Sequence, residues 1–383
     1  MSTSDDLRLP ADGLTTMITR IFAAAGAADD EARAIAANLV GANLSGHDSH
    51  GVVRVPRYLM WADTGNLHFG RSVETIIDSE AFALLDGNKG FGQVIGRQAV
   101  ELGIAKAEAL GAAVVGLRRS GHLGRIGHWA ETACRAGLVS VHFVNVAESM
   151  LVAPFGGAER RMSTAPVTIG VVNPDGDDFI LDFATSTTAE GKVMVALRGG
   201  KPLPDGALVD GDGRNTRDPL ALYGDLAPGD NPDPRDGPGA LVAMGDHKGS
   251  GLALACELLA GALTGSGTTG PGKKTHNGVL SIYVKPGALD DGHGFAAAVA
   301  GYIDFVRSAR PVDPAQPVMV PGDPERKARA ERQAHGLPLP TAAWNSILDA
   351  GVNLGLKRDD LIALAPPVTS PVTSPVISPV APA

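Results

Sequence analysis

From Thr75 onward, short apolar segments alternate with longer helix-like segments, and this alternation constrains the fold more than any other feature of the sequence. Strands that alternate with helices are typical of layered α/β folds. We therefore expect an α/β layer architecture for the middle of the chain. The strand-like segments are 75–77, 81–86, 112–117, 138–146, 167–172, 179–183 and 278–284, and the helix-like segments include 96–110, 127–136 and 295–308.

The beginning of the chain has a different, helical character. Leu14 to Ala25 shows helical spacing, and Asp29 or Asp30 is a candidate N-cap for a second helix that runs to Leu44. Positions 199–239, by contrast, are rich in Gly, Pro and Asp with little periodicity, which predicts a long surface loop.

The last part of the chain is predicted to be helical and then disordered. A segment rich in Arg and Glu follows 318–325, and 341–364 carries one or two helices. Their predicted buried face is Trp344, Ile347 and Leu348. The Thr-Ser-Pro-Val repeats from Pro366 to Ala383 have no core-forming pattern, so we expect an extended, disordered tail.

Charge and cysteine content exclude several classes of protein. The 383 residues carry a net charge of -9, and no cluster of Lys and Arg suggests a nucleic-acid groove or an anionic membrane surface as a partner. The two cysteines, Cys134 and Cys256, lie in apolar segments, and neither a signal-like start nor an 18-residue apolar span occurs. We expect a reduced, cytoplasmic protein.

Residues 45–58, Ser-Gly-His-Asp-Ser-His-Gly-Val-Val-Arg-Val-Pro-Arg-Tyr, gather more polar chemistry than packing requires. His50, Arg54 and Tyr58 are four apart and would share one face of a helix. Pro56 interrupts such a helix and more naturally opens a new one through Tyr58 to Ala62, which leaves His50 and Arg54 on the turn before it. This segment is a candidate wall of an active site.

These side chains suit a small carboxylate that also carries a carbonyl or hydroxyl group. Arg54 can grip the carboxylate with two hydrogen bonds, and His50 can transfer a proton near neutral pH. Tyr58 or Ser49 can add a hydrogen bond. The alternative is that the histidines are solvated loop residues and that Arg54 pairs with a nearby acid.

Three later stretches are further candidates for binding. In 118–129, three glycines at intervals of three allow close approach to a ligand, and His122 can serve in proton transfer or as a structural hydrogen-bonding residue. The dinucleotide fingerprint G-x-G-x-x-G is absent, so a Rossmann domain is not expected. The hydroxyl-rich run 182–188 can line a cofactor groove or cap a helix. At 247–251, a glycine-containing helix start with Lys248 can hold a phosphate or carboxylate.

Several motifs together resemble one family, the malate/L-lactate dehydrogenase type of NAD(P)-dependent oxidoreductases, which lacks a Rossmann fold. They occur in the family's order, and the Gly-His-Asp-Ser-His-Gly and Phe-Gly-Gly motifs look most like its hydroxycarboxylate dehydrogenase branch. Two departures are Ser-Thr-Ala-Pro at 163–166, where relatives usually have Gly-Thr-Asn-Pro, and Pro-Gly-Asp in place of Pro-Gly-Glu. The matching motifs are 48–58, 120–124, 153–157, 181–186, 210–219, 247–254 and 321–323.

The resemblance implies a non-Rossmann, two-layer α/β cofactor-binding domain over 73–319, with a helical domain formed by 1–72 and 320–365. It implies a homodimer that binds NAD or NADP and transfers hydride between the cofactor and a small 2-hydroxy or 2-oxo acid. His50 would be the proton donor or acceptor, with His122 as its partner or in its place, and Ser49, Arg54 and Tyr58 would bind the substrate. The cofactor contacts implied by position are Asp178, Phe179, Ile180, Leu181, Asp182, Phe183, Ala184, His247, Lys248, Gly322, Asp323 and Pro324.

Two other classes of function remain as alternatives. A metal-dependent hydrolase or lyase could use ligands from His47, Asp48, His50, His122 and His128, although no His-Glu-x-x-His motif or cysteine pair supports it. A protein that binds a small acid without turning it over is the third hypothesis. The sequence does not indicate the substrate acid, the physiological direction of the reaction, or the preference between the two nicotinamide cofactors.

Overall fold

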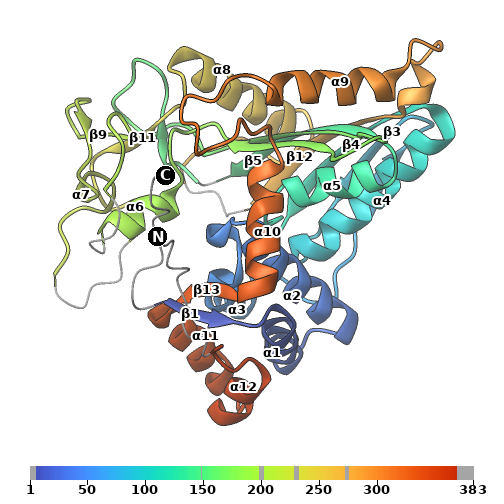
Figure 1. Ribbon diagram of the computed structural model, residues 1–383. Coiled ribbons are helices and arrows are strands. Elements are labelled where there is room, and N and C mark those ends of the chain that lie inside the picture. The colour runs from blue at the N-terminus through green and yellow to red at the C-terminus, as the bar shows by residue number, and fades with distance from the viewer. Residues whose placement is uncertain (1–5, 148, 198–201, 228–232, 272–275, 369–383) are drawn as a thin grey trace, which may run out of the picture.

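The computed structural model describes residues 6–147, 149–197, 202–227, 233–271 and 276–368, and shows a mixed α/β protein with three sheets. Figure 1 shows a large sheet with helices above and below it, a small lobe at one side, and a helical region beneath that contains both the first and the last described elements. The helices are α1 (Ala11–Ala24), α2 (Asp29–Leu44), η1 (Asp48–His50), η2 (Val52–Arg54), α3 (Val55–Asp63), α4 (Gly92–Leu110), α5 (Gly127–Arg135), α6 (Glu190–Leu197), α7 (Leu220–Tyr223), α8 (His247–Cys256), η3 (Glu257–Ala262), η4 (Pro286–Ala288), α9 (Phe295–Arg307), α10 (Asp323–His335), α11 (Thr341–Asn353) and α12 (Arg358–Leu364).

The large sheet has seven strands in the order β2-β3-β4-β12-β5-β7-β8. Only β3 and β4 pair in parallel, and every other pair in this sheet is antiparallel. The strands are β1 (Asp6–Leu9), β2 (Glu74–Asp78), β3 (Phe82–Asp86), β4 (Ala112–Ser120), β5 (Val139–Ala147), β6 (Val152–Ala153), β7 (Pro166–Val171), β8 (Phe179–Ala184), β9 (Leu208–Val209), β10 (Asn215–Thr216), β11 (Ala240–Val242), β12 (His276–Val284) and β13 (Leu337–Pro340).

Helices contact both faces of the large sheet. α4 and α5 pack on one face, where Ile95, Trp129 and Leu117 share a buried apolar cluster. The π-helical turn η3 contacts β4, β5 and β12, and α8 contacts β5 and β7. The predicted alternation of strands and helices is confirmed, but the expected two layers are three, because the helix that begins at His247 covers the second face.

The helical region has its own core, built from both ends of the chain. In α1, Leu14, Met17, Ile18, Ile21 and Phe22 follow the helical spacing that the sequence predicted, and all are buried. Trp344, Ile347 and Leu348 of α11 join the same cluster, as predicted, and β1 pairs antiparallel with β13.

The predicted cap of α2 is wrong, whereas the predicted helix is confirmed. Ala28 occupies the N-cap position without a side-chain hydrogen bond, and Asp29 and Asp30 lie in the first turn of the helix. Their carboxylates there still favour the positive end of the helix dipole, so an aspartate stabilises this helix start without capping it.

The expected surface loop at 199–239 is also partly wrong. Its described residues include β9, β10 and α7, and β9 belongs to a four-stranded sheet with β6, β10 and β11. Leu208, Leu222 and Tyr223 are fully buried there. The sequence did not reveal this lobe, because its strands are only two or three residues long and carry too few side chains to show a period.

Other predictions concern the chain end, the membrane and the cysteines. Most of the predicted disordered tail, 369–383, lies outside the described residues. No helix in the described part of the chain is long and apolar enough to cross a bilayer. Cys134 and Cys256 are free and buried, and burial raises the pKa of each thiol to about 12.

Candidate active site

The predicted site segment forms two short 3-10 turns followed by a helix, as Pro56 indicated. η1 and η2 carry His50 and Arg54, and Pro56 lies in the first turn of α3. We call residues 47–58 the catalytic turn. Asn43 of α2 fixes its backbone, because its amide nitrogen donates to Asp48 at 2.6 Å and its amide oxygen accepts from the Val52 N–H at 2.8 Å.

Helix α10 holds the catalytic turn from the other end of the chain. Arg332 donates to both carboxylate oxygens of Asp48, at 2.6 and 3.0 Å. His47 Nε2 lies 3.0 Å from Glu325, and Arg329 donates to Ser45 Oγ at 2.7 Å. The sequence showed α10 only as a helix rich in Arg and Glu, so these contacts were missed. A bidentate Arg–carboxylate pair fixes orientation as well as distance.

His50 and His122 meet face to face although they are distant in sequence. Their ring centroids are 5.4 Å apart with an interplanar angle of 6°. His122 follows the end of β4, and its Nδ1 lies 2.6 Å from the Tyr58 hydroxyl. The structure thus brings together both predicted catalytic histidines and Tyr58.

Burial keeps both imidazoles neutral at pH 7. It lowers the pKa of His50 to about 3, with the positive charge of Arg54 as the next contribution. The pKa of His122 falls well below its usual range for the same two reasons, in the same order. Burial also raises the pKa of Tyr58 to about 12, so its hydroxyl keeps its proton.

Arg54 is oriented by the backbone of the turn itself. Its Nε donates to the Ser49 carbonyl oxygen at 2.6 Å, and within the described residues it makes no ion pair. The alternative prediction, in which Arg54 pairs with a nearby acid, does not hold for this part of the chain. A Cβ atom added at Gly191 of α6 would lie 3.2 Å from Ser49 Cβ, so the small-sheet lobe closes against this side of the site.

A small cavity of about 50 Å³ lies next to His122. Trp61 and Asn66 come from α3 and the loop that follows it, and the sequence did not single them out. Their one sequence signal was proximity to the catalytic turn. The residues that line the cavity are Trp61, Asn66, Leu67, His122, Val146, His276 and Asn277.

The predicted cofactor segments lie together at the β8 edge of the large sheet. The Ile180 N–H donates to the Pro321 carbonyl at 3.3 Å, which joins β8 to the start of α10. Phe183 of β8 and Leu252 of α8 contact the same small apolar cluster. The segments that contain Asp178, Lys248 and Gly322 are therefore neighbours in space.

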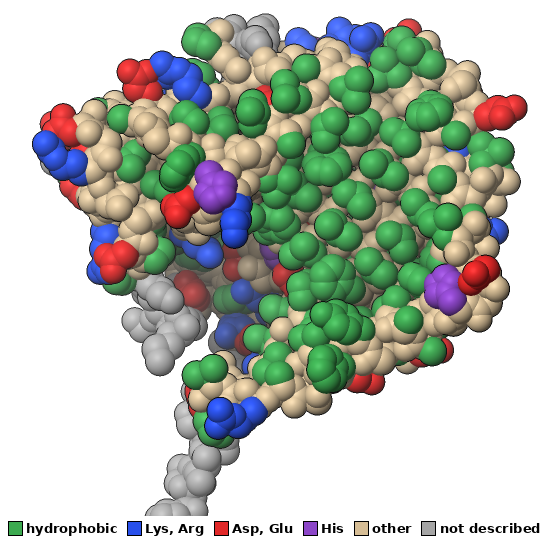
Figure 2. Space-filling view, turned by 90° about the horizontal axis from the view of Figure 1, so that it is seen from above, with side chains coloured by type: hydrophobic (Ala, Val, Ile, Leu, Met, Phe, Trp, Pro, Cys, Tyr) green, Lys and Arg blue, Asp and Glu red, His purple; other side chains and the backbone are tan. Residues whose placement is uncertain are grey.

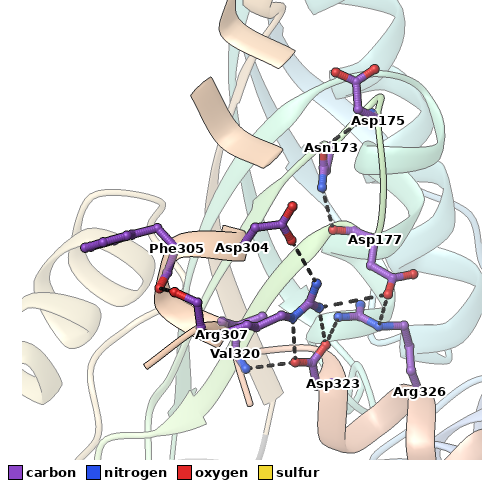
Figure 3. Close-up of polar contacts among 10 residues, drawn as sticks. Asn173, Asp175, Asp177, Asp304, Phe305, Arg307, Val320, Asp323 and Arg326 are labelled. Carbon is purple, nitrogen blue, oxygen red and sulfur yellow. Dashed lines mark hydrogen bonds and ion pairs between the residues drawn. The ribbon is translucent and has the colours of Figure 1, made fainter. Parts of the chain in front are cut away.

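The acidic side chains of these segments are engaged within the protein. Asp182 accepts from Thr168 at 2.7 Å and from the Gly127 N–H at 2.7 Å, at the start of α5. Asp323 pairs with Arg307 and Arg326, each at 2.6 Å, and accepts from the Val320 N–H (Figure 3). We call Asp177, Arg307, Asp323 and Arg326 the Asp323 cluster.

Side-chain and backbone donors that were expected to face a ligand instead bond locally. Thr185 and Thr187 donate to backbone carbonyls of neighbouring segments. At the start of α8 the N–H groups of Lys248, Gly249 and Ser250 donate to carbonyls of 244–246. The expected free N–H groups at this helix start are therefore a wrong prediction, whereas the side chains of His247 and Lys248 are exposed.

The predicted histidine cluster does not form a metal site in the described part of the chain. There, the one group of three or more His, Cys, Asp or Glu side chains with converging ligand atoms is Asp290, Asp291 and His293, on the surface. His47 is directed to Glu325, and His50 and His122 stack on each other. Among the described residues, these histidines therefore do not converge as ligands of one metal ion.

Comparison with known proteins decides the family. The sequence profile described as malate/L-lactate dehydrogenase matches residues 9–348. The chain belongs to this family. It is 36% identical over 379 residues to hydroxycarboxylate dehydrogenase B of Escherichia coli K12, which covers 95% of this chain and 99% of that protein.

Solved structures agree with this assignment. An Escherichia coli protein described as a malate/lactate dehydrogenase has a TM-score of 0.86 at 36% identity, over 93% of this chain and 98% of its own. Sulfolactate dehydrogenase from Methanocaldococcus jannaschii has a TM-score of 0.80 at 30% identity, over 92% and 99%. The predicted reaction class is confirmed: this member of the malate/L-lactate dehydrogenase family is an NAD(P)-dependent dehydrogenase of 2-hydroxy acids.

Proposed function

We propose that this enzyme transfers hydride reversibly between a nicotinamide cofactor, NAD or NADP, and a small 2-hydroxy or 2-oxo acid of the hydroxycarboxylate type, with His50 as the proton-transfer group. The observation that carries this proposal is the stacked pair of neutral imidazoles, His50 and His122, beside the guanidinium of Arg54. Oxidation of a hydroxy acid requires a base for the hydroxyl proton and a cation for the carboxylate.

His50 fits the role of base because its ring is unprotonated and one of its ring nitrogens has no hydrogen-bond partner among the described residues. Its Nδ1 is buried, with no hydrogen-bond partner among the described residues. At neutral pH the ring is unprotonated, so it can accept the proton of the substrate hydroxyl while the hydride leaves the carbon that bears this hydroxyl. Burial is the first cause of its low pKa and the charge of Arg54 the second, and a substrate carboxylate bound to Arg54 would offset this second cause, which favours return of the proton in the reduction direction.

Arg54 is proposed to bind the substrate carboxylate. The hydrogen bond from its Nε to Ser49 leaves both Nη groups free of acceptors among the described residues. A planar guanidinium held by one edge can still donate two parallel hydrogen bonds to a carboxylate. Ser49 lies at the same side of the site, and Tyr58 acts on the substrate through its hydrogen bond to His122.

The cofactor is proposed to lie along the β8 edge. A bound nicotinamide supplies the hydride acceptor or donor. The exposed side chains of His247 and Lys248 fit its phosphates, and the backbone of 178–184 and of 322–324 would line the groove. Figure 2 shows a recess beside the small-sheet lobe with charged side chains inside it. Asp182 and Asp323 would position this groove, since their oxygens are already bonded.

The test is a panel of 2-oxo acids with NADH and with NADPH, followed at 340 nm. We expect oxidation of one reduced cofactor with several small 2-oxo acids, and the reverse reaction with the matching 2-hydroxy acids. If neither cofactor is oxidised with any acid of the panel, and the purified protein binds the acids without turnover, the proposed function is wrong.

We further propose that the enzyme is a homodimer. Figure 2 shows a broad apolar surface over the side of the molecule where α8 and α9 lie, and η3 continues α8 along the chain. Leu263, Tyr302 and Phe305 are 67%, 70% and 72% exposed. A contiguous apolar surface of this kind typically marks a protein interface.

Light scattering after size-exclusion chromatography tests the dimer. We expect twice the chain mass for the wild type and a shift toward the monomer for L258E, which places a charge in this surface. V352E is the matched control, because Val352 is an exposed apolar residue on α11, at the opposite side of the molecule (Figure 1). A monomeric wild type at micromolar concentration would contradict the proposal.

A further inference from the structure

We infer that Gln93 and Tyr58 are positioning residues that lock His122 in a single tautomer, with its proton on Nε2, so that His122 presents a neutral N–H donor to the substrate oxygen. This inference rests on the proposed function and assigns different roles to the two histidines. His50 exchanges the proton, and His122 polarises the oxygen from which the proton leaves.

First, two hydrogen bonds fix the orientation of the Gln93 side-chain amide. Gln93 is buried in the first turn of α4, and its amide nitrogen lies 3.3 Å from the His122 carbonyl oxygen and 3.1 Å from the Tyr58 hydroxyl. A carbonyl oxygen can only accept a hydrogen bond. The NH2 group of Gln93, and not its amide oxygen, must therefore face His122 and Tyr58.

The second step follows from the single proton of the tyrosine hydroxyl. Because the Tyr58 oxygen accepts from Gln93, its own proton is free to point at His122 Nδ1, 2.6 Å away. Nδ1 then accepts a hydrogen bond and carries no proton. A neutral imidazole in this state has its proton on Nε2. Burial keeps the pKa of Tyr58 at about 12, consistent with a hydroxyl that donates and does not ionise.

The third step is the close packing that makes this arrangement possible. A Cβ atom at Gly92 would lie 2.2 Å from the His122 carbonyl oxygen, so the residue before Gln93 must be glycine for α4 to start this close to His122. Phe91 packs edge to face against Tyr58, with centroids 6.1 Å apart and an interplanar angle of 71°. The start of α4 is thus fitted to both members of the chain of hydrogen bonds.

The consequence for catalysis is a preorganised donor. Negative charge develops on the substrate oxygen as the hydroxyl loses its proton, and a fixed N–H donor in a buried site stabilises that charge without reorganisation. A His122 ring free to exchange tautomers would present a lone pair to the substrate for part of the time. Gln93 and Tyr58 remove that state.

The test is the protonation pattern of His122, read from nitrogen-15 chemical shifts in enzyme labelled only at histidine, with H122N to assign the signals. In the wild type at pH 7 we expect Nδ1 to have the shift of an unprotonated ring nitrogen and Nε2 that of a protonated one. In Q93E the carboxylate can only accept, so it takes the Tyr58 proton, and we expect the proton of His122 to move toward Nδ1. Y58F removes the donor, and we expect a mixture of tautomers.

Activity gives the second readout. We expect Q93E and Y58F to lower kcat by about 10²-fold, the effect of losing one preorganised donor, while the KM for the cofactor stays the same. Q93M, which neither donates nor accepts, should fall between Q93E and the wild type. The matched controls are Q98E on α4 and Y283F, which changes a buried tyrosine in the core beneath that helix. Both should keep the wild-type nitrogen shifts of His122.

The outcomes separate this inference from the proposed function. A protonated Nδ1 in the wild type, or an unchanged pattern in folded Q93E, overturns the inference even when the enzyme reduces 2-oxo acids. An intact Nε2–H tautomer in a protein without any dehydrogenase activity would leave the positioning by Gln93 and Tyr58 supported, and would count against the proposed function alone.

Discussion

The catalytic turn and the Asp323 cluster are both built from charged and polar side chains, but they differ in how many of those groups are satisfied. In the Asp323 cluster, Asp323 receives hydrogen bonds from Arg307, Arg326 and the Val320 N–H, as Figure 3 shows. In the catalytic turn, Nδ1 of His50 is buried without a partner among the described residues, and Arg54 makes no ion pair there.

The difference separates scaffold from chemistry. A buried polar group without a partner costs about 1–3 kcal/mol, so a fold retains one chiefly where a ligand completes it. A carboxylate that already has three donors has little left to offer a ligand. Substitutions in the catalytic turn should therefore reduce mainly turnover or substrate affinity, and substitutions in the Asp323 cluster should reduce mainly stability.

The largest effect is expected for H50N. Asparagine preserves the approximate size of the ring but cannot take up a proton, so kcat should fall by about 10²- to 10⁴-fold. The dissociation constant of the cofactor, measured by fluorescence titration, should change little. H293N is the control, because His293 is an exposed histidine in the segment just before α9, outside the catalytic turn. Wild-type turnover in H50N would remove His50 from the proposed role.

R54M should act mainly on substrate affinity. Loss of a charge-assisted pair costs about 1.5–3 kcal/mol, which corresponds to a rise of about 10- to 150-fold in the KM for the acid. R57M is the matched control, since Arg57 is exposed and its loss removes one positive charge from the same turn. If R54M and R57M raise this KM equally, the substrate carboxylate is attracted only by the total positive charge of the turn, and Arg54 does not bind it directly.

D323N tests the other side of the comparison and should mainly reduce stability. The surrounding arginines and the Val320 N–H hold the pKa of Asp323 at about 2, below its usual 3.8. The stabilisation is present above pH 3.8 and is lost as the pH falls toward 2. At about 1.4 kcal/mol per pKa unit it amounts to about 2 kcal/mol. Urea unfolding at pH 7 should show this loss in D323N, and equal stability of the two proteins would show that the cluster is not a scaffold.

Much of the catalytic turn was predictable because its signal is local. His50, Arg54 and Tyr58 lie within nine positions, and Pro56 fixed where the helix begins. The contacts of Arg332 and Gln93 were not predictable, because both residues reach the turn from distant parts of the chain. His122 was a candidate in the sequence, but its contacts with His50 and Tyr58 were not. Only the packing of α4, α10 and β4 around the turn brings them together.

For the fold, too, the sequence predicted the elements with a local pattern and missed those that depend on long-range contacts. Periodicity located α1, α4 and the strands of the large sheet, because each has enough residues to repeat a pattern. It missed the small-sheet lobe, where the strands β9 and β10 have two residues each, and it missed β1 and β13, whose pairing joins the two chain ends. Strand order and the second helical layer depend on tertiary contacts that no local pattern encodes.

The smallest effect on turnover is expected for His142, which has the same side chain as His50 but has hydrogen-bond partners at both ring nitrogens. Its Nδ1 lies 2.8 Å from Ser281 Oγ and its Nε2 lies 3.1 Å from Ser140 Oγ, and burial lowers its pKa to about 4. The folded protein therefore keeps this ring neutral between pH 6.5 and 4, whereas the unfolded chain binds a proton. Stability falls as the pH falls through that window, by at most about 1.4 kcal/mol per pH unit for this one group.

H142Q removes this proton uptake from the unfolded chain. The free energy of unfolding, measured in urea at several pH values from 7 to 4.5, should decline less steeply in H142Q than in the wild type, even where its absolute value is lower. Turnover of folded H142Q should stay close to that of the wild type, because a histidine with both nitrogens bonded in the core has no free valence for a substrate. A wild-type slope together with a large loss of kcat would reverse the division between satisfied and unsatisfied groups.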